Sequence, residues 1–345
     1  MKKIINLLLC LPLLFLCACD VHEWPEAPEF VKCHLRLNYD TDMTEWYHMY
    51  NDGVLTETGY GKTYDNSRSY GHIRYIVRTY PKGKTVSISD YTQEFVFTKE
   101  IANGYDHEVT LDIMPGNYMV MVWSDLVQTS GASYFHNAEN FGRIMLQGEH
   151  KGNDDYRDAF RGTNDITLVS DIMERLPDTL DIAMHRPLAK YEFVTGDIIE
   201  FIQKESVRAR KGNSDDVPTK TANIEDYKVV FHYVGFMPDT YSIDTDKPVD
   251  SSTGIFFETS LKQISESQAS MGFDYVFVRK EDSYTSIQFE ICDKGGRQLT
   301  LSKVIDIPIG RNYHTKVVGS FLTARSKEGT LINPTYNGDH NLVFP

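Results

Sequence analysis

Alternation of hydrophobic and polar residues is the main pattern along this chain. From Val31 to Tyr39 every second residue is apolar, which predicts a strand with one buried face. The same pattern predicts strands in the first half at 72–80, 93–98, 107–114, 118–123, 179–184 and 188–195. Pro115-Gly116 separates two alternating runs, so we expect a turn between two paired antiparallel strands. Residues 40–71 and 130–164 have no sustained period, and we expect a long surface loop over 40–71.

The second half continues in short strands. They are predicted at 227–233, 254–258, 274–278, 286–292, 298–307, 315–322 and 329–332. Lys294-Gly295-Gly296 predicts a hairpin turn, and 197–210 has the spacing of a short helix. These patterns indicate an all-β protein of two domains, with the boundary near His185-Arg186-Pro187. We therefore expect an N-terminal β-sandwich over 30–185 and a C-terminal one over 186–345.

The N-terminus has the pattern of an export signal. Lys2 and Lys3 precede an apolar run over 4–16, too short to span a membrane. Leu16-x-Ala18-Cys19 resembles a bacterial lipobox, so residues 1–18 are predicted to be a lipoprotein signal peptide and Cys19 the lipidated residue. The alternative is a plain secretory signal with a chance cysteine. Residues 19–29 are acidic and contain two prolines, as expected of a linker.

Charge and cysteines narrow the possibilities further. The net charge is −14, which argues against a nucleic-acid partner and leaves membrane attachment to the lipid. Of five cysteines, two leave with the signal peptide and Cys19 takes the lipid. We expect Cys33 and Cys292 to be buried thiols, with a disulfide between them as the alternative.

The chain contains none of the common catalytic or metal-binding motifs, so no catalytic residue, metal site or cofactor is predicted. Residues 40–51 lack the glycine and glutamate of an EF-hand loop, which leaves a looser calcium site as the alternative. Aromatic residues crowd the predicted loop over 40–71. Trp46 and Tyr60 are the candidate ligand-binding residues, because exposed rings stack on sugars or dock on proteins; the alternative is that they fill the core.

Five phrases, in this order, resemble the fimbrillin superfamily of Bacteroidales: DIMPGNYMVMVWSD at 112–125, YRDAFRG at 156–162, HRPLAK at 185–190, DYVFV at 274–278 and IPIGRNYHTKVVG at 307–319. The resemblance implies two tandem transthyretin-like β-sandwich domains. It also implies a fimbrium anchor or accessory or tip subunit, which joins other fimbrial subunits by strand donation. In many members a protease removes the first strand after a basic residue. No convincing signal follows 31–39 here, because Lys62 and Arg68 lie in the predicted loop.

Three functions remain at this point. The leading one is a non-catalytic, surface-exposed adhesion lipoprotein of the outer membrane and fimbrium, with fimbrial subunits as partners. The alternative is a glycan-binding surface lipoprotein of a nutrient-uptake system, motivated by Trp46 and Tyr60. The third is a β-sandwich hydrolase, motivated only by abundant carboxylates, whose spacing identifies no catalytic pair.

Overall fold

The computed structural model describes residues 29–84, 90–101, 104–169, 178–212, 223–280 and 283–323. The predicted signal peptide, Cys19, nearly all of the predicted linker and the strand expected at 329–332 lie outside these ranges. Within them, no helix is both long and apolar enough to cross a membrane. The structure is built almost entirely of strands, so the all-β prediction is confirmed.

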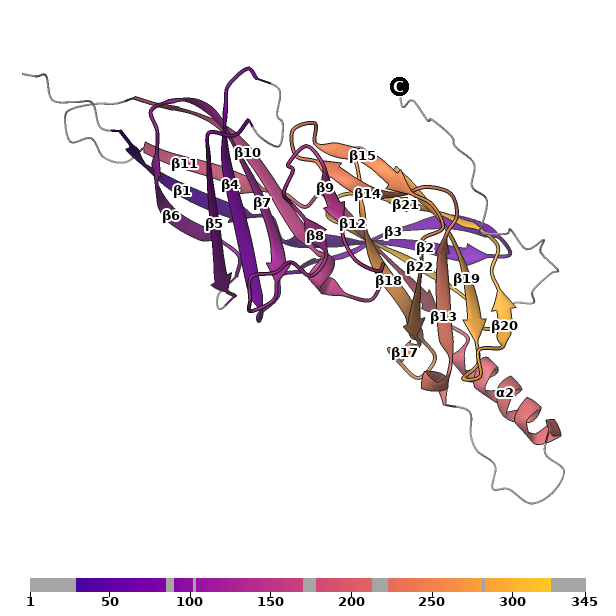
Figure 1. Cartoon of the computed structure of the whole chain (residues 1–345). Coiled ribbons are helices and arrows are strands. Elements are labelled where there is room, and N and C mark those ends of the chain that lie inside the picture. The colour runs from indigo at the N-terminus through magenta and orange to yellow at the C-terminus, as the bar shows by residue number, and fades with distance from the viewer. Residues whose placement is uncertain are drawn as a thin grey trace, which may run out of the picture.

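The first half of the chain forms two facing sheets around one apolar core (Figure 1). One sheet has the order β11 (Asp178–Met184), β1 (Val31–Tyr39), β6 (His107–Ile113). The other has the order β10 (Ala159–Leu168), β7 (Gly116–Val127), β4 (His72–Pro81), β5 (Gln93–Glu100). The alternation of β1 buries Cys33, Leu35 and Leu37 in the core, as the sequence predicts.

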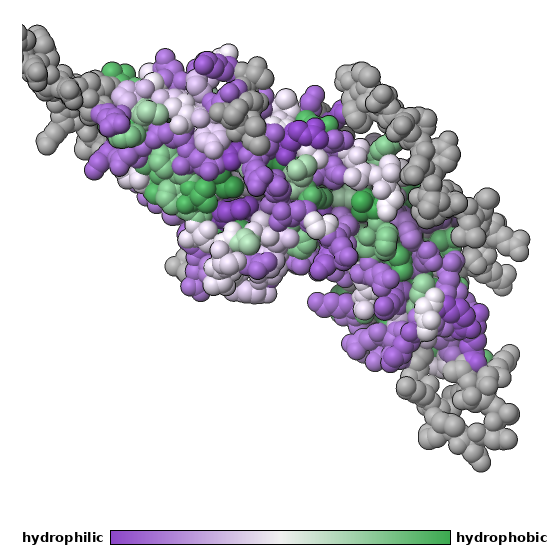
Figure 2. All heavy atoms as spheres, in the orientation of Figure 1, coloured by the Kyte–Doolittle hydropathy of each residue, from purple (hydrophilic) through white to green (hydrophobic). Residues whose placement is uncertain are grey.

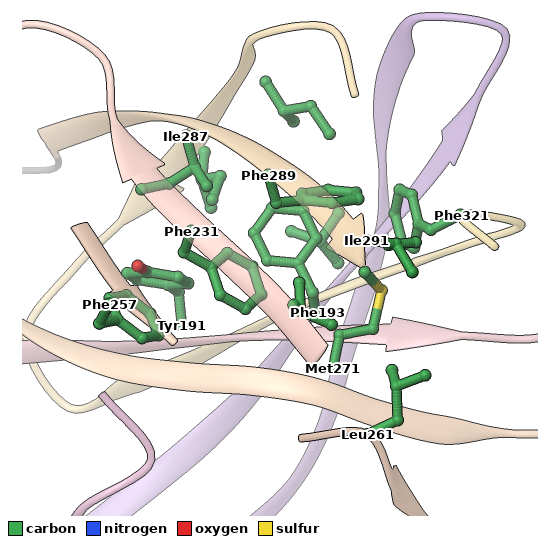
Figure 3. Packing of buried hydrophobic residues seen from close by; sticks show 14 of the residues in the cluster. Tyr191, Phe193, Phe231, Phe257, Leu261, Met271, Ile287, Phe289, Ile291 and Phe321 are labelled. Carbon is green, nitrogen blue, oxygen red and sulfur yellow. The ribbon is translucent and has the colours of Figure 1, made fainter. Parts of the chain in front are cut away.

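The second half forms a larger pair of sheets. Six strands follow the order β17 (Lys262–Gln263), β18 (Ala269–Phe277), β12 (Leu188–Thr195), β22 (Tyr313–Gly319), β2 (Asp42–Asn51), β3 (Val54–Asp65). The facing sheet contains β16 (Phe256–Ser260), β13 (Lys228–Tyr233), β19 (Ser283–Cys292), β20 (Gln298–Leu301) and β21 (Ile305–Ile309). Phenylalanines from both sheets meet in the core between them, among them Phe193, Phe231 and Phe289 (Figure 3).

A small sheet and a third apolar cluster connect the two halves. The small sheet pairs strands of both halves in the order β15 (Lys247–Ser252), β14 (Met237–Ser242), β9 (Ile144–Leu146), β8 (His136–Asn137). The cluster contains Trp123 and Phe141 of the first half and Tyr241 and Phe277 of the second. The predicted short helix is present as α2 (Ile198–Gly212), and single turns occur at Asp155–Arg157 and Ile224–Asp226.

The expectation of a long surface loop over 40–71 is wrong. Residues 42–65 form the hairpin β2–β3, which we call the edge hairpin, and β2 pairs in parallel with β22 of the second half. Figure 1 shows this indigo hairpin among orange and yellow strands. Two register shifts between β2 and β3 break the period of two, which hid the strands in the sequence. The N-terminal range predicted for the first sandwich therefore contains two strands that pair with the second.

Pro115-Gly116 does not join a hydrogen-bonded pair, so that expectation is also wrong. β6 pairs with β1, whereas β7 pairs with β4 and β10, and the turn carries the chain from one sheet to the facing one. Alternation predicts that both segments are strands, but it does not specify which strands become neighbours. The residues 130–164, which showed no regular pattern, contain β8, β9 and the start of β10.

Other expectations are confirmed. The chain turns at Lys294-Gly295-Gly296 between β19 and β20, which are antiparallel, and Gly296 has the positive φ of 79° that suits glycine. Cys33 and Cys292 are both buried, belong to different sandwiches and form no disulfide.

Figure 2 shows a mostly polar visible face, on which hydrophobic residues gather in separate patches.

Candidate functional site: the edge of the six-stranded sheet

Among the strands of five or more residues in the described chain, the most exposed is β3, at the end of the six-stranded sheet. It has 12 residues, and only Leu55, Gly59 and Tyr64 are even partly buried. β3 pairs with β2 along one side, and no strand within the described residues pairs with the other side. As far as the described residues go, a row of backbone N–H and C=O groups along that side is free to pair with another chain.

The structure brings the two predicted ligand-binding residues together. Trp46 of β2 lies opposite Tyr60 of β3, and their rings stack with centroids 6.0 Å apart. Tyr313 of β22 completes the group, 5.4 Å from Trp46 and 5.7 Å from Tyr60. Trp46 is 7% exposed and Tyr60 is 59% exposed, so Tyr60 supplies most of the accessible aromatic surface. Ligand binding by the pair stays a prediction.

Polar atoms beside this aromatic group lack partners. His48 packs edge-on against Trp46 with ring centroids 4.9 Å apart, and burial lowers the pKa of its imidazole. Within the described residues, neither the Trp46 indole nitrogen nor His48 Nδ1 has a hydrogen-bond partner. Both nitrogens are buried, so the Tyr60 ring is the main accessible part of this group.

The other face of the edge hairpin carries a polar network. Lys316 donates to Glu45 over 2.7 Å, and the Tyr47 hydroxyl donates to the same carboxylate over 3.0 Å. Burial raises the pKa of Glu45, but its hydrogen bonds with Lys316 and Tyr47 outweigh that effect and lower the pKa below its usual range. Glu45 is therefore an ionised, paired carboxylate that anchors β2 to β22 and not a poised acid.

A second carboxylate of this face, Glu192, is also fully engaged. It accepts from the Ser270 hydroxyl over 2.6 Å and lies 3.1 Å from His314 Nε2, while His314 Nδ1 contacts the Tyr64 hydroxyl. Burial raises the pKa of Glu192, but these partners outweigh burial and lower the pKa to about 2. Among the described residues no three histidine, cysteine or acidic side chains are grouped so as to hold a metal ion. The surface offers contact groups and not an acid–base pair.

A buried arginine holds the edge hairpin in place, a role that the sequence did not reveal. Arg186 is fully buried and grips both oxygens of Asp158, over 2.7 and 2.9 Å. It also donates to the backbone carbonyls of Thr41 and Asp42, where β1 passes into β2, and to the Asn312 side chain. The tripeptide at 185–187 marked a boundary in the sequence, but a boundary arginine is usually exposed, so nothing in the pattern pointed to a buried one.

The comparison with family models places the chain in a family without an assigned role. A family model described as "Family of unknown function (DUF6562)" matches residues 28–345. The chain belongs to this family. No curated protein matches the chain.

Several solved structures resemble this one at low identity. The fimbrial anchor protein Mfa2 from Porphyromonas gingivalis is 10% identical, with a TM-score of 0.37, over 79% of this chain and 82% of that one. A fimbrial assembly protein from Parabacteroides distasonis is 10% identical, with a TM-score of 0.36, over 83% and 90%. A candidate adhesin from Bacteroides thetaiotaomicron is 11% identical, with a TM-score of 0.44, over 80% and 81%. The chain is similar to these Bacteroidales structures at 10–11% identity.

Proposed function

We propose that this chain is a non-catalytic lipoprotein of the outer membrane that serves a fimbrium as its anchor or as an accessory or tip subunit. It acts in adhesion by contact and joins other fimbrial subunits by strand complementation at β3. The observation that carries the proposal is the open side of β3, a strand of 12 residues that is exposed along almost its whole length. The lipobox at Cys19 and the ordered fimbrillin-like phrases support it.

A donated strand fits β3 for a physical reason. Adding a strand satisfies the open backbone groups, and alternate side chains of the donor then pack on the two faces of the sheet. Tyr60 and Val54 are 59% and 63% exposed and offer apolar surface to such a donor. Lys62 in the same strand adds a charge, which discourages unspecific pairing at this edge.

The position of the first strand favours its retention, and so a terminal role in the fimbrium over a repeating one. β1 is the central strand of its sheet, between β11 and β6, and only residues 40 and 41 separate it from β2. Arg68, a basic residue beyond it, has a side chain that is 16% exposed and stacked on Tyr156, with 4.3 Å to the ring centre. A protease that needs an accessible basic residue is therefore hindered at Arg68.

Paired proline variants test strand complementation. Successive residues point their N–H groups to opposite sides of a strand, so one of Thr56→Pro and Glu57→Pro removes an outward donor and the other removes a bond to β2. We expect one variant to keep the native melting temperature but lose fimbrial subunits in cross-linking from cells. The other variant should lose stability. If both variants cross-link the subunits as the native chain does, β3 is not the docking edge.

Lipid anchoring is tested separately at Cys19. Labelled palmitate should enter the native chain and not the Cys19→Ser variant, and the variant should leave the membrane fraction. A variant that remains membrane-bound would refute the anchor, whatever happens at β3.

The second candidate function, glycan binding for nutrient uptake, is favoured by the exposed ring of Tyr60, which stacks on Trp46. On a glycan array, binding by the native chain should be lost in Tyr60→Ala, whereas Tyr284→Ala removes an even more exposed ring elsewhere and is the control. Unchanged binding in Tyr60→Ala would remove this candidate.

A further inference from the structure

One extended run of the chain passes through both halves of the molecule. β1 belongs to the first sandwich, and β2 belongs to the six-stranded sheet of the second half. Only Asp40 and Thr41 lie between the two strands, and neither residue has a positive φ. We call residues 31–51 the through-strand. At about 3.3 Å per residue, an extended run of this length reaches about 70 Å. Figure 1 shows the through-strand leading from the far end of the first half into the second half.

Both halves hold the through-strand along its length. In the first half, β11 pairs in parallel with residues 33–39, and β6 pairs antiparallel with residues 31–37. In the second half, β22 pairs in parallel with residues 44–50, and β3 pairs antiparallel with residues 42–51. β1 and β2 are thus each flanked by a strand on both sides. Sliding the through-strand lengthwise therefore breaks whole rows of backbone hydrogen bonds together.

The short link between β1 and β2 is held by contacts from three other segments. The Asp40 carboxylate accepts from the Asn312 side chain over 2.6 Å. The Thr41 carbonyl accepts from the Asn66 N–H over 3.0 Å and from the Arg186 guanidinium over 3.2 Å. Bending the link breaks these hydrogen bonds, so it fixes β1 and β2 end to end and does not act as a hinge.

From this geometry we infer that the through-strand carries mechanical tension between the membrane and the fimbrium. The inference rests on the proposed function, because the lipid at Cys19 and the subunit docked on β3 are the two ends of the load. The predicted linker joins Cys19 to β1, and a tight turn joins β2 to β3. A pull between the two ends runs along β1 and β2, whereas the two sandwiches are attached beside this path.

The direction of the pull decides how well a sheet resists it. The hydrogen bonds of a sheet lie across its strands, so a lengthwise pull shears a whole row together, whereas a crosswise pull opens the bonds one after another. Each backbone hydrogen bond contributes little by itself, so the number that must break together sets the barrier. The through-strand is also already extended, and unfolding the sandwiches adds almost no length to it. Tension along this path is therefore resisted in the strongest direction of both sheets.

Single-molecule force spectroscopy tests the inference on the chain without its predicted signal peptide. Cys19→Ser removes the lipid site, and Phe30→Cys and Lys62→Cys provide handles before β1 and on β3. Both handle positions are exposed, whereas Cys33 and Cys292 are buried and stay unlabelled. Lys62 lies in the part of β3 beside the start of β2, so the pull runs along β1.

A matched pair of handles changes only the direction of the pull. Phe30→Cys and Asp112→Cys place the handles at the same end of β1 and β6, because Val31 lies opposite Ile113 in that antiparallel pair. Asp112 is also exposed, and this pull peels the two strands apart bond by bond. Rupture forces report the unfolding barrier, and we expect the force for handles at 30 and 62 to be at least about twofold higher.

Equal rupture forces for the two pairs of handles would overturn the inference, and so would a lower force for handles at 30 and 62. The measurement needs neither lipid nor partner, so either result leaves the tests at Cys19 and β3 to decide the proposed function. Conversely, a Cys19→Ser chain that stays membrane-bound would refute the anchor without changing the measured dependence on direction.

Discussion

At the scale of single residues, buried charges and buried imidazoles decide where this protein is sensitive. Arg186 and Asp158 are 0% and 2% exposed and face each other inside the joint between the halves. Lys190 and Asp155 form a second pair across the same joint, 2.8 Å apart. A buried pair adds little net stability, but the loss of one partner leaves an uncompensated charge in a poorly solvated place.

Replacing Arg186 should therefore be costly. In Arg186→Met the Asp158 carboxylate and the Thr41 and Asp42 carbonyls lose their donor, and we expect a loss of about 3–5 kcal/mol in the free energy of unfolding. The control is Arg36→Met, which breaks exposed pairs with Glu108 and Asp181 and should cost about 0–1 kcal/mol. Urea denaturation measures both. Equal losses would mean that the joint does not depend on Arg186.

His136 makes stability depend on pH. Its pKa is about 3 in the folded chain and near 6.5 when unfolded, so below pH 6.5 only the unfolded state takes up the proton. The free energy of unfolding therefore keeps its full value above pH 6.5 and decreases as the pH falls from 6.5 toward 3. In His136→Phe, stability should fall less steeply between pH 6.5 and 5, by up to about 1.4 kcal/mol per pH unit. Denaturation at several pH values measures this.

The matched control is His185→Gln, which replaces a half-exposed histidine. We expect this variant to follow the native pH profile. A native slope in His136→Phe would contradict the prediction and indicate that other buried groups dominate acid sensitivity.

At the scale of elements, the edge hairpin is the unit that the sequence pattern hid. Its turn has a recognisable sequence, Asp52-Gly53. These residues have φ values of 51° and 94°, the left-handed pair of a tight hairpin turn. Asp-Gly between two segments rich in threonine and tyrosine favours a hairpin. Without a clean period of two in the flanking segments, the turn alone did not predict strands.

The turn gives a prediction for the hairpin. Gly53→Ala places a side chain at a positive φ and should cost about 1–2 kcal/mol of the free energy of unfolding. Its added Cβ meets only the flexible end of Lys303, so the cost comes from the backbone. Gly196→Ala is the control, because its Cβ has only ordinary contacts, and we expect little change. Denaturation that does not separate the two variants would contradict a tight turn at 52–53.

At the scale of the whole molecule, the chain order and the spatial order of the strands differ. β1 belongs to the first sandwich, the next two strands belong to the second, and β4 returns to the first. The apolar cluster around Trp123 and Phe277 and the small sheet of β14 and β9 add contacts between the halves. Pulling the halves apart thus requires removal of β2 from beside β22.

This arrangement predicts that the second half does not fold alone. A fragment of residues 186–345 lacks β2 and β3, so the side of β22 that pairs with β2 is left open. We expect the fragment to aggregate or melt well below the full chain, and a peptide of residues 40–66 to raise its melting temperature. Calorimetry of the full chain should give one transition. A stable, soluble fragment without the peptide would contradict the shared sheet.

The sequence by itself determined the kind of element nearly everywhere that one face is buried. Residues such as Cys33, Leu35 and Leu37 alternate because each lies on the core face of one strand, and this local rule leaves a trace in the sequence. Trp46 and Tyr60 were also identified from the sequence, because aromatic residues stand out in a polar segment. Their contact was not predictable, because it needs the register of β2 against β3.

Only the tertiary structure decided which strands are neighbours and which charges are buried. The parallel pairing of β2 with β22 joins residues about 270 positions apart, such as Glu45 and Lys316, and no local period encodes such a distance. The burial of Arg186 likewise arises where segments from both halves meet. Local alternation specifies a strand and its inner face, whereas the partner of that strand is chosen by the packing of the whole chain.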